Sequence, residues 1–142
     1  MTPIQVVIDT NVIVSAFRSQ LGASHRLVKL IGDDRWQINI STALLLEYEA
    51  VLKRESVKLG IEFSVAEDIL DYMTLMAVKR SVVYKIRPGL IDPSDDFVLE
   101  LAVESNAMFI ITYNLKDFVG AESYGVEAIK PQSFLNLMEG VK

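Results

Sequence analysis

The 142-residue sequence contains no cysteine and only one histidine, His25. The lack of cysteine excludes disulfides, thiolate zinc sites and a cysteine nucleophile. A single histidine cannot build a histidine-rich metal centre and argues against a Ser-His-Asp triad. We expect His25 to be a surface or helix-capping group.

Long apolar runs and a basic excess are also missing. No run approaches the length that spans a bilayer, and the N-terminus lacks the basic and apolar regions of a signal peptide. The net charge of −5 argues against a domain that coats nucleic acid by bulk electrostatics, but it permits a nuclease with its acids in one cleft. We therefore expect one soluble, cytoplasmic domain over residues 1–142, with no membrane association.

The first apolar segment, residues 4–8, predicts a buried strand. Four of its five residues are β-branched, and the lack of polar alternation is typical of a strand covered on both faces, as in a parallel sheet. Asp9 follows directly, where open α/β sheets place their ligands. The alternative is that Asp9 caps the next helix.

Strands and helices alternate along the rest of the chain. Hydrophobic periodicity and end signals place further strands at 36–40, 82–84, 108–112 and 126–129, and helices at 12–17, 24–31, 42–54, 64–77, 95–105 and 131–138. The expected caps are Ser24, Ser41, Ser64 with Glu67, and Ser94 or Asp95. This order predicts an α/β fold, a three-layer α/β/α sandwich around a mainly parallel sheet of about five strands.

Polar side chains should gather at the carboxyl edge of that sheet. Asp9 and Asn114 or Asp117 would come from strand ends, Asp95 and Asp96 from a helix start, and Glu47 from a helix border. The alternatives are that the Asp pair complements the helix dipole and that Glu47 and Glu49 are both solvated. Such oxygen donors suit Mg²⁺ or Mn²⁺, which would relieve their mutual repulsion.

A basic cluster flanks the expected strand at 82–84. It consists of Lys79, Arg80, Lys85 and Arg87. Either this is a solvated basic edge or it contacts phosphate.

Four motifs in order resemble a PIN domain. They are Asp9-Thr10-Asn11, Glu47 ahead of residues 51–54, Asp95-Asp96 ahead of residues 99–102, and residues 111–118. The resemblance covers residues 4–137 and extends more narrowly to the VapC-like toxins of prokaryotic toxin–antitoxin systems.

This resemblance implies an endoribonuclease with three or four acids around one or two Mg²⁺ or Mn²⁺ ions. It assigns catalysis and metal binding to Asp9, Glu47 and either Asp95, favoured by its spacing to Ala102, or Asp96. Asn114 stands where many relatives carry Asp, so a second ion would be held weakly or would need Asp117. Thr112, and Thr10 or Asn11, would orient the ligands or a water.

The resemblance also implies partners. These are an RNA substrate, cleaved to a 5′-phosphate and a 3′-hydroxyl, a cognate antitoxin, and a second copy in a homodimer. The candidate dimer surfaces are the helices around residues 44–52 and 69–76, although core packing explains those residues equally well. Candidates for holding the RNA backbone, which the sequence does not rank, are Arg18, Arg54, Arg87 and Lys116.

Two other functions compete with this one. A haloacid-dehalogenase-like phosphatase would use Asp9 as nucleophile, but Asn11 stands where that family needs its general acid. A PIN-like module that binds RNA or protein without cleaving is the second, and Asn114 is the feature that favours it.

Overall fold

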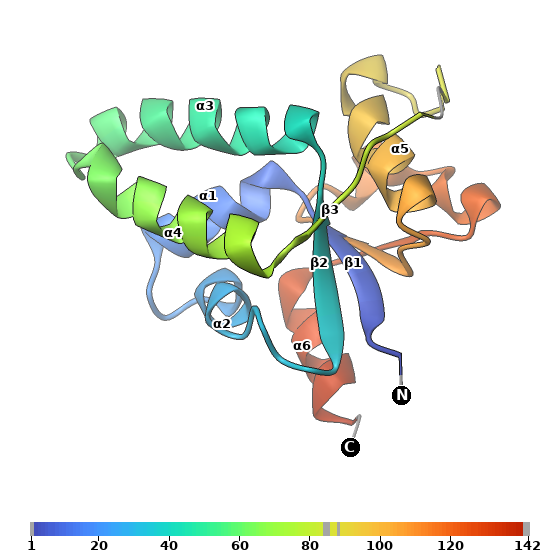
Figure 1. The fold of residues 1–142 in the computed structure, drawn as a ribbon, viewed down its shortest axis with the longest axis horizontal. Coiled ribbons are helices and arrows are strands. Elements are labelled where there is room, and N and C mark those ends of the chain that lie inside the picture. Colours follow the sequence, from blue (N-terminus) through green and yellow to red (C-terminus); the bar gives the residue numbers. More distant parts are fainter. Residues whose placement is uncertain (1, 84–85, 88, 141–142) are drawn as a thin grey trace.

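The first strand lies at the centre of the sheet in the computed structural model, which describes residues 2–83, 86–87 and 89–140. β1 (Ile4–Ile8) pairs in parallel with β2 (Trp36–Ile40) on one side and β4 (Phe109–Ile111) on the other. β3 (Val78–Lys79) and β5 (Glu127–Ile129) form the edges, so the order is β3-β2-β1-β4-β5 and every pairing is parallel. β1 and β2 lie side by side in Figure 1. The predicted five-stranded parallel sheet is confirmed.

Helices form the two outer layers. They are α1 (Thr10–Arg18), α2 (Ala23–Lys29), α3 (Thr42–Leu59), α4 (Phe63–Met76), α5 (Asp96–Glu104) and α6 (Pro131–Glu139). The connections from β1 to β2 and from β2 to β3 advance in one direction across the sheet, and the connection from β3 to β4 returns in the other. Because such crossovers are right-handed, α1 to α4 cover one face and α5 covers the opposite one. α6 packs against α2.

The strand order reverses direction between β1 and β4, at their shared carboxyl edge. Ligands of open α/β sheets bind at such a point. Asp9 follows β1, and its N–H still donates to the carbonyl of Ile111 at 2.9 Å. Thr112 follows β4, and its N–H donates to the carbonyl of Ile129 at 2.9 Å. Residues 103 positions apart in the sequence therefore meet at one edge of the sheet.

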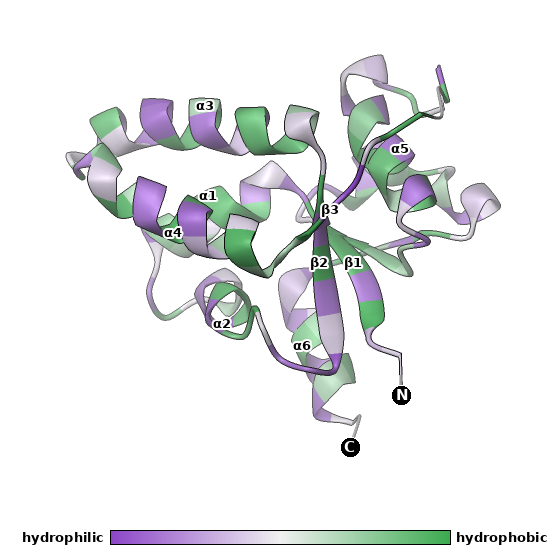
Figure 2. Cartoon of the chain, in the orientation of Figure 1, coloured by the Kyte–Doolittle hydropathy of each residue, from purple (hydrophilic) through white to green (hydrophobic). Residues whose placement is uncertain are grey.

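The helices are amphipathic around a core of aliphatic and aromatic side chains. In Figure 2, α3 and α4 alternate between hydrophilic and hydrophobic segments, and Leu44, Tyr48 and Leu52 of α3 are buried. The Tyr48 hydroxyl donates to the carbonyl of Ile8, so α3 is tied to the end of β1. In the part of the chain that the structure describes, no helix has the length and apolarity needed to cross a bilayer.

The third strand differs from its prediction. It lies at Val78–Lys79, whereas Val82 and Val83 form no strand and Tyr84 lies outside the described residues. The physical reason is the length of the neighbouring strand. β2 ends at Ile40, whose carbonyl accepts the last bond from the Arg80 N–H at 2.9 Å, so β2 offers no backbone partner to Val82 and Val83.

Several predicted helix caps were wrong. Ser24 and Ser64 lie inside α2 and α4, which begin after Gly22 and Glu62 without a side-chain cap. Asp95 does occupy the N-cap position of α5, but its side chain makes no capping bond, and Asp92 instead accepts an N–H at the start of the 3₁₀ turn Pro93–Asp95 that leads into α5. Ser41 does cap α3, accepting from the N–H of Leu44 at 3.2 Å. α3 continues five residues past Arg54, to Leu59.

Candidate active site

Asp9 has two partners at the carboxyl end of β1. One oxygen accepts the N–H of Thr10 at 2.9 Å, which caps α1, and the other accepts the Thr112 hydroxyl at 2.8 Å. Asp9 is 9% exposed. Burial raises the pKa of its carboxyl above the usual value, the bonds from Thr112 and Thr10 lower it, and the charges of Glu47 and Asp117 raise it further. One oxygen of Asp9 therefore caps α1. The charges of Glu47 and Asp117 are still close enough to act on the Asp9 carboxyl.

Glu47 is joined to Asp9 through Thr10. The Thr10 hydroxyl donates to a carboxylate oxygen of Glu47, while the Thr10 N–H donates to Asp9. Glu49, on the opposite border of the α3 apolar face, is exposed. Of the two glutamates that the sequence left open, Glu47 is therefore the one beside Asp9.

Asp95 and Asp117 complete the group of neighbouring negative charges. Burial, and then the charges of Asp117, Asp9, Asp92 and Glu47, raise the pKa of Asp95 to about 6. A partly buried carboxyl surrounded by other carboxylates holds its proton more tightly because ionisation adds to their repulsion. A bound divalent cation would reverse this effect.

Asp96 is placed differently from its neighbour. It is fully buried, and its carboxylate accepts the N–H groups of Leu90 at 3.0 Å and Gly89 at 3.2 and 3.3 Å. Glu100, one helical turn further along α5, accepts the N–H of Ile86 at 2.8 Å. Both carboxylates therefore anchor the chain ahead of α5. The sequence analysis did not predict this role, although Glu100, an acid in the middle of an apolar helix, was a sign that it has a buried partner.

The Thr112 hydroxyl has its orientation fixed by three bonds. It accepts the side-chain amide of Asn11 at 3.4 Å and the N–H of Asn114 at 3.0 Å. A hydroxyl that accepts twice directs its one proton to the remaining partner, which here is Asp9. Asn11 also accepts the N–H of Tyr113 at 3.3 Å. The side chains expected to orient the site, Thr10, Asn11 and Thr112, therefore all bond within it.

The oxygen donors of these side chains are of the chemical type that a hard divalent cation prefers. The acids supply carboxylate oxygens that repel one another, and Asn114, whose backbone N–H donates to the Thr112 hydroxyl, is exposed. Within the described residues, no three acidic, histidine or cysteine side chains are gathered closely enough to hold one ion together. Mg²⁺ usually keeps several waters and takes only one or two carboxylates directly, so an ion at these acids would be held partly through water.

Two of the four cations proposed to hold RNA are engaged in ion pairs. Arg18 pairs with Glu55 at 3.0 Å, and Arg87 pairs with the buried Glu100 at 3.2 Å. Lys116 is exposed and directly precedes Asp117 in the sequence.

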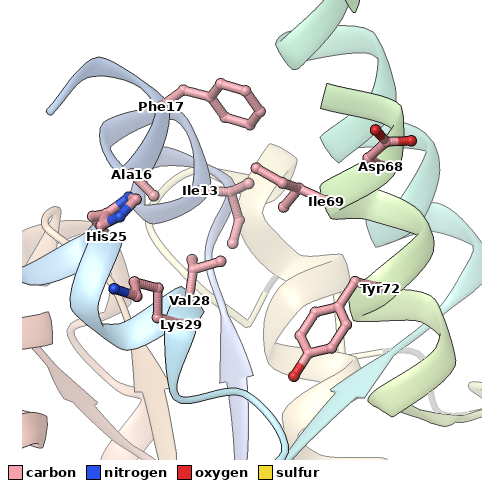
Figure 3. Close-up of a pocket in the computed structure, with 9 residues that line it drawn as sticks. All are labelled: Ile13, Ala16, Phe17, His25, Val28, Lys29, Asp68, Ile69 and Tyr72. Atoms are coloured by element: carbon pink, nitrogen blue, oxygen red, sulfur yellow. The ribbon is translucent and has the colours of Figure 1, made fainter. Parts of the chain in front are cut away.

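A separate cavity of about 370 Å³ lies between α1, α2 and α4 (Figure 3). Its described lining is Ile13, Ala16, Phe17, His25, Val28, Lys29, Asp68, Ile69 and Tyr72. These residues include none of the predicted site residues, so we assign this cavity no part in the chemistry of the acids.

Comparison with known proteins agrees with this arrangement. The family model of the PIN domain matches residues 5–116, which include Asp9, Glu47, Asp95 and Asn114. No curated protein matches the sequence. PIN domains are generally nucleases that typically use divalent metal ions. The match covers most of the chain, and the chain belongs to the PIN domain family.

Proposed function

We propose that this protein is a metal-dependent endoribonuclease that hydrolyses phosphodiester bonds with Mg²⁺ or Mn²⁺. The observation that supports this most is that Glu47 and Asp117 each lie within electrostatic range of both Asp9 and Asp95, which also interact with each other. They come from distant parts of the sequence and gather where open α/β sheets bind ligands. Membership of a family of nucleases supports the same reaction class.

The acids that would hold the metal in this proposal, one or two directly and the others through bound water, are Asp9, Glu47, Asp95 and Asp117, with Asn114 as a weaker neutral donor. An ion held by these acids would activate a water for attack and would polarise the scissile phosphate. Asp96 has the separate task of holding the chain before α5, because its carboxylate already accepts from Gly89 and Leu90.

The chain's own residues prepare the acids for this task. The Thr112 hydroxyl and the Thr10 N–H hold the two oxygens of Asp9, and the Thr10 hydroxyl holds Glu47. Thr10 and Thr112 therefore orient the oxygens of both carboxylates, and Asn11 fixes Thr112 in turn.

The finer biological proposal is the toxin of a toxin–antitoxin pair, a single domain over residues 1–142 that acts in the cytoplasm. Its partners would be a cognate antitoxin and a second copy of the chain. Exposed apolar side chains on α3 and α4, which include Leu46, Val57 and Leu75, support contact with another protein. They do not distinguish the antitoxin from the second copy.

A PIN-like module that binds without cleaving is the second candidate, and Asn114 favours it. An amide ligates a metal more weakly than a carboxylate, and Asn114 stands at the end of β4, where a fourth acid is expected. Metal titration of the purified protein by calorimetry separates the two functions, because a module without activity should show no Mg²⁺ or Mn²⁺ binding that depends on Asp9.

The direct test compares RNA cleavage by the wild type and Asp9→Asn in Mn²⁺. Asn also caps helices well, so the variant should fold and lose cleavage. Glu47→Gln should lose activity too, while Glu49→Gln, on the exposed border of the same helix, should retain it. Cleavage by Asp9→Asn at the wild-type rate would refute the assignment and indicate a contaminating nuclease.

A further inference from the structure

A groove with three positive side chains lies at the carboxyl ends of β2 and β3. Two adjoining cavities, of about 190 and 230 Å³, share Ser41, Thr42, Arg80 and Ser81 in their linings. Lys79 lines the first, and Arg87 and Glu100 line the second. The chain has a net charge of −5, so the three cations give this groove a local charge opposite in sign to that of the whole protein.

Arg80 is held in place by a buried partner. Its Nε donates to the Oδ1 of Asn39 at 3.0 Å. Asn39 is 1% exposed, and its amide nitrogen is fixed by the side-chain oxygen of Gln5 at 2.9 Å and the carbonyl of Val6 at 3.2 Å. Among the described residues, no acceptor contacts the terminal nitrogens of Arg80. The guanidinium is therefore oriented from the core with those nitrogens available for an anion.

Arg87 is oriented in a comparable way. Its guanidinium pairs with Glu100, and the two side chains are 55% and 2% exposed. The carboxylate is thus covered while the cation borders the groove. Lys79 adds a third charge, and its ammonium donates to the carbonyl of Thr74 at 2.9 Å.

The groove adjoins the acids through α3. Thr42 begins this helix at the groove, and Glu47 follows five residues later, about 7.5 Å along the helix axis. The start of the helix adds partial positive charge. A single nucleic-acid strand lying across the acids is therefore close enough to place neighbouring phosphates in the groove.

We propose that this groove binds backbone phosphates of the RNA strand that is cut at the acids. The inference rests on the proposed nuclease function and adds a substrate subsite to it. Arginine, lysine and hydroxyl side chains are the usual phosphate contacts, and such contacts position a strand without reading its sequence. The groove therefore sets the register of the strand over the acids and leaves base preference to other parts of the surface.

The test measures binding of a short fluorescent single-stranded RNA in EDTA at several salt concentrations. For single strands, each phosphate contact contributes about 0.7 to the slope of log affinity against log salt. The double variant Lys79→Gln/Arg80→Gln should therefore lower that slope by about 1.4 relative to wild type. Lys58→Gln, at the far end of α3, removes one charge and should leave the slope unchanged. If the double variant fails to fold, Lys79→Gln alone should lower the slope by about 0.7.

A second measurement excludes a purely structural effect. Methylphosphonate linkages remove the charge of one phosphate at a time, and wild-type affinity should fall at one or two positions. The RNA affinity of the Lys79→Gln/Arg80→Gln variant should not change when methylphosphonate is placed at those same positions. Equal slopes and equal methylphosphonate profiles in both proteins would overturn the inference, as would absence of RNA binding by the wild type. If the wild type binds RNA as expected but cleaves no RNA in Mn²⁺, the nuclease proposal fails, while the conclusion that the groove binds RNA phosphates is retained.

Discussion

Two adjacent aspartates at the start of α5 have different surroundings. Asp95 is half-buried among other acids, whereas Asp96 is fully buried and bonded to backbone N–H groups. Successive helical residues point about 100° apart, so neighbours at a helix start readily face different parts of a protein. Substitution to Asn, which removes one charge at nearly constant shape, should therefore have opposite effects at the two positions.

At Asp95, we expect Asp95→Asn to stabilise the metal-free protein at neutral pH. The folded-state pKa of about 6 lies above the ordinary 3.8, so ionisation of Asp95 opposes folding, and this cost grows as pH rises from the lower pKa to the higher. Asn carries no such cost. Thermal denaturation in EDTA should show a higher Tm for the variant at pH 7.5 and nearly equal values near pH 4. A lower Tm for the variant at pH 7.5 would contradict the electrostatic argument.

At the scale of the element, α5 connects the candidate site with the chain ahead of it. Asp96 and Glu100 lie one turn apart and bind the N–H groups of Ile86, Gly89 and Leu90. Gly89 suits this close packing, because a Cβ there would lie 2.7 Å from the carbonyl oxygen of Ile86. The other four buried residues of α5 are all apolar. These bonds hold the start of the helix, and with it Asp95.

We therefore expect Asp96→Asn to destabilise the fold. An amide can turn only one oxygen to the N–H groups of Gly89 and Leu90, and its NH₂ would face a donor. Leaving such a buried group unsatisfied costs about 1–3 kcal/mol. Urea denaturation at pH 7.5 measures the loss, with Asp95→Asn as the neighbouring control. Calorimetry should still detect Mn²⁺ binding by folded Asp96→Asn; loss of binding with unchanged stability would make Asp96 a metal ligand instead.

At the scale of the whole molecule, the strand order places the acids together. β1 and β4 are adjacent although about a hundred residues separate them, so Asp9 meets Thr112 and the residues that follow it. The fold therefore holds like charges together that would separate in an unfolded chain. A divalent cation that binds only the folded state should relieve this repulsion and stabilise the protein.

Mn²⁺ should accordingly raise the Tm of the wild type, and EDTA should reverse the change. At a metal concentration 100 times the Kd, the stabilisation amounts to about 2.7 kcal/mol. Asp9→Asn keeps the α1 cap but loses a carboxylate, so its Tm should respond little. Glu49→Gln should respond as the wild type does. A Tm of the wild type that is indifferent to both Mn²⁺ and Mg²⁺ would argue against a metal site at these acids.

The local features of the fold were predictable from the sequence. β1 and β2 have the predicted bounds because β-branching and the spacing of apolar residues act within a few positions. The Ser41 cap and the α6 start at Pro131 were equally local signals. The motif order also sufficed to indicate a PIN domain, which the family match supports.

Only the tertiary structure decided which polar groups meet. The edge strand at Val78–Lys79 depends on where β2 ends, which is a non-local pairing. The difference between Glu47 and Glu49 comes from the hydroxyl of Thr10, and the orientation of Arg80 comes from Asn39. Periodicity assigns a residue to a face of its own element. The direction in which a border side chain points depends on groups brought beside it from distant parts of the chain.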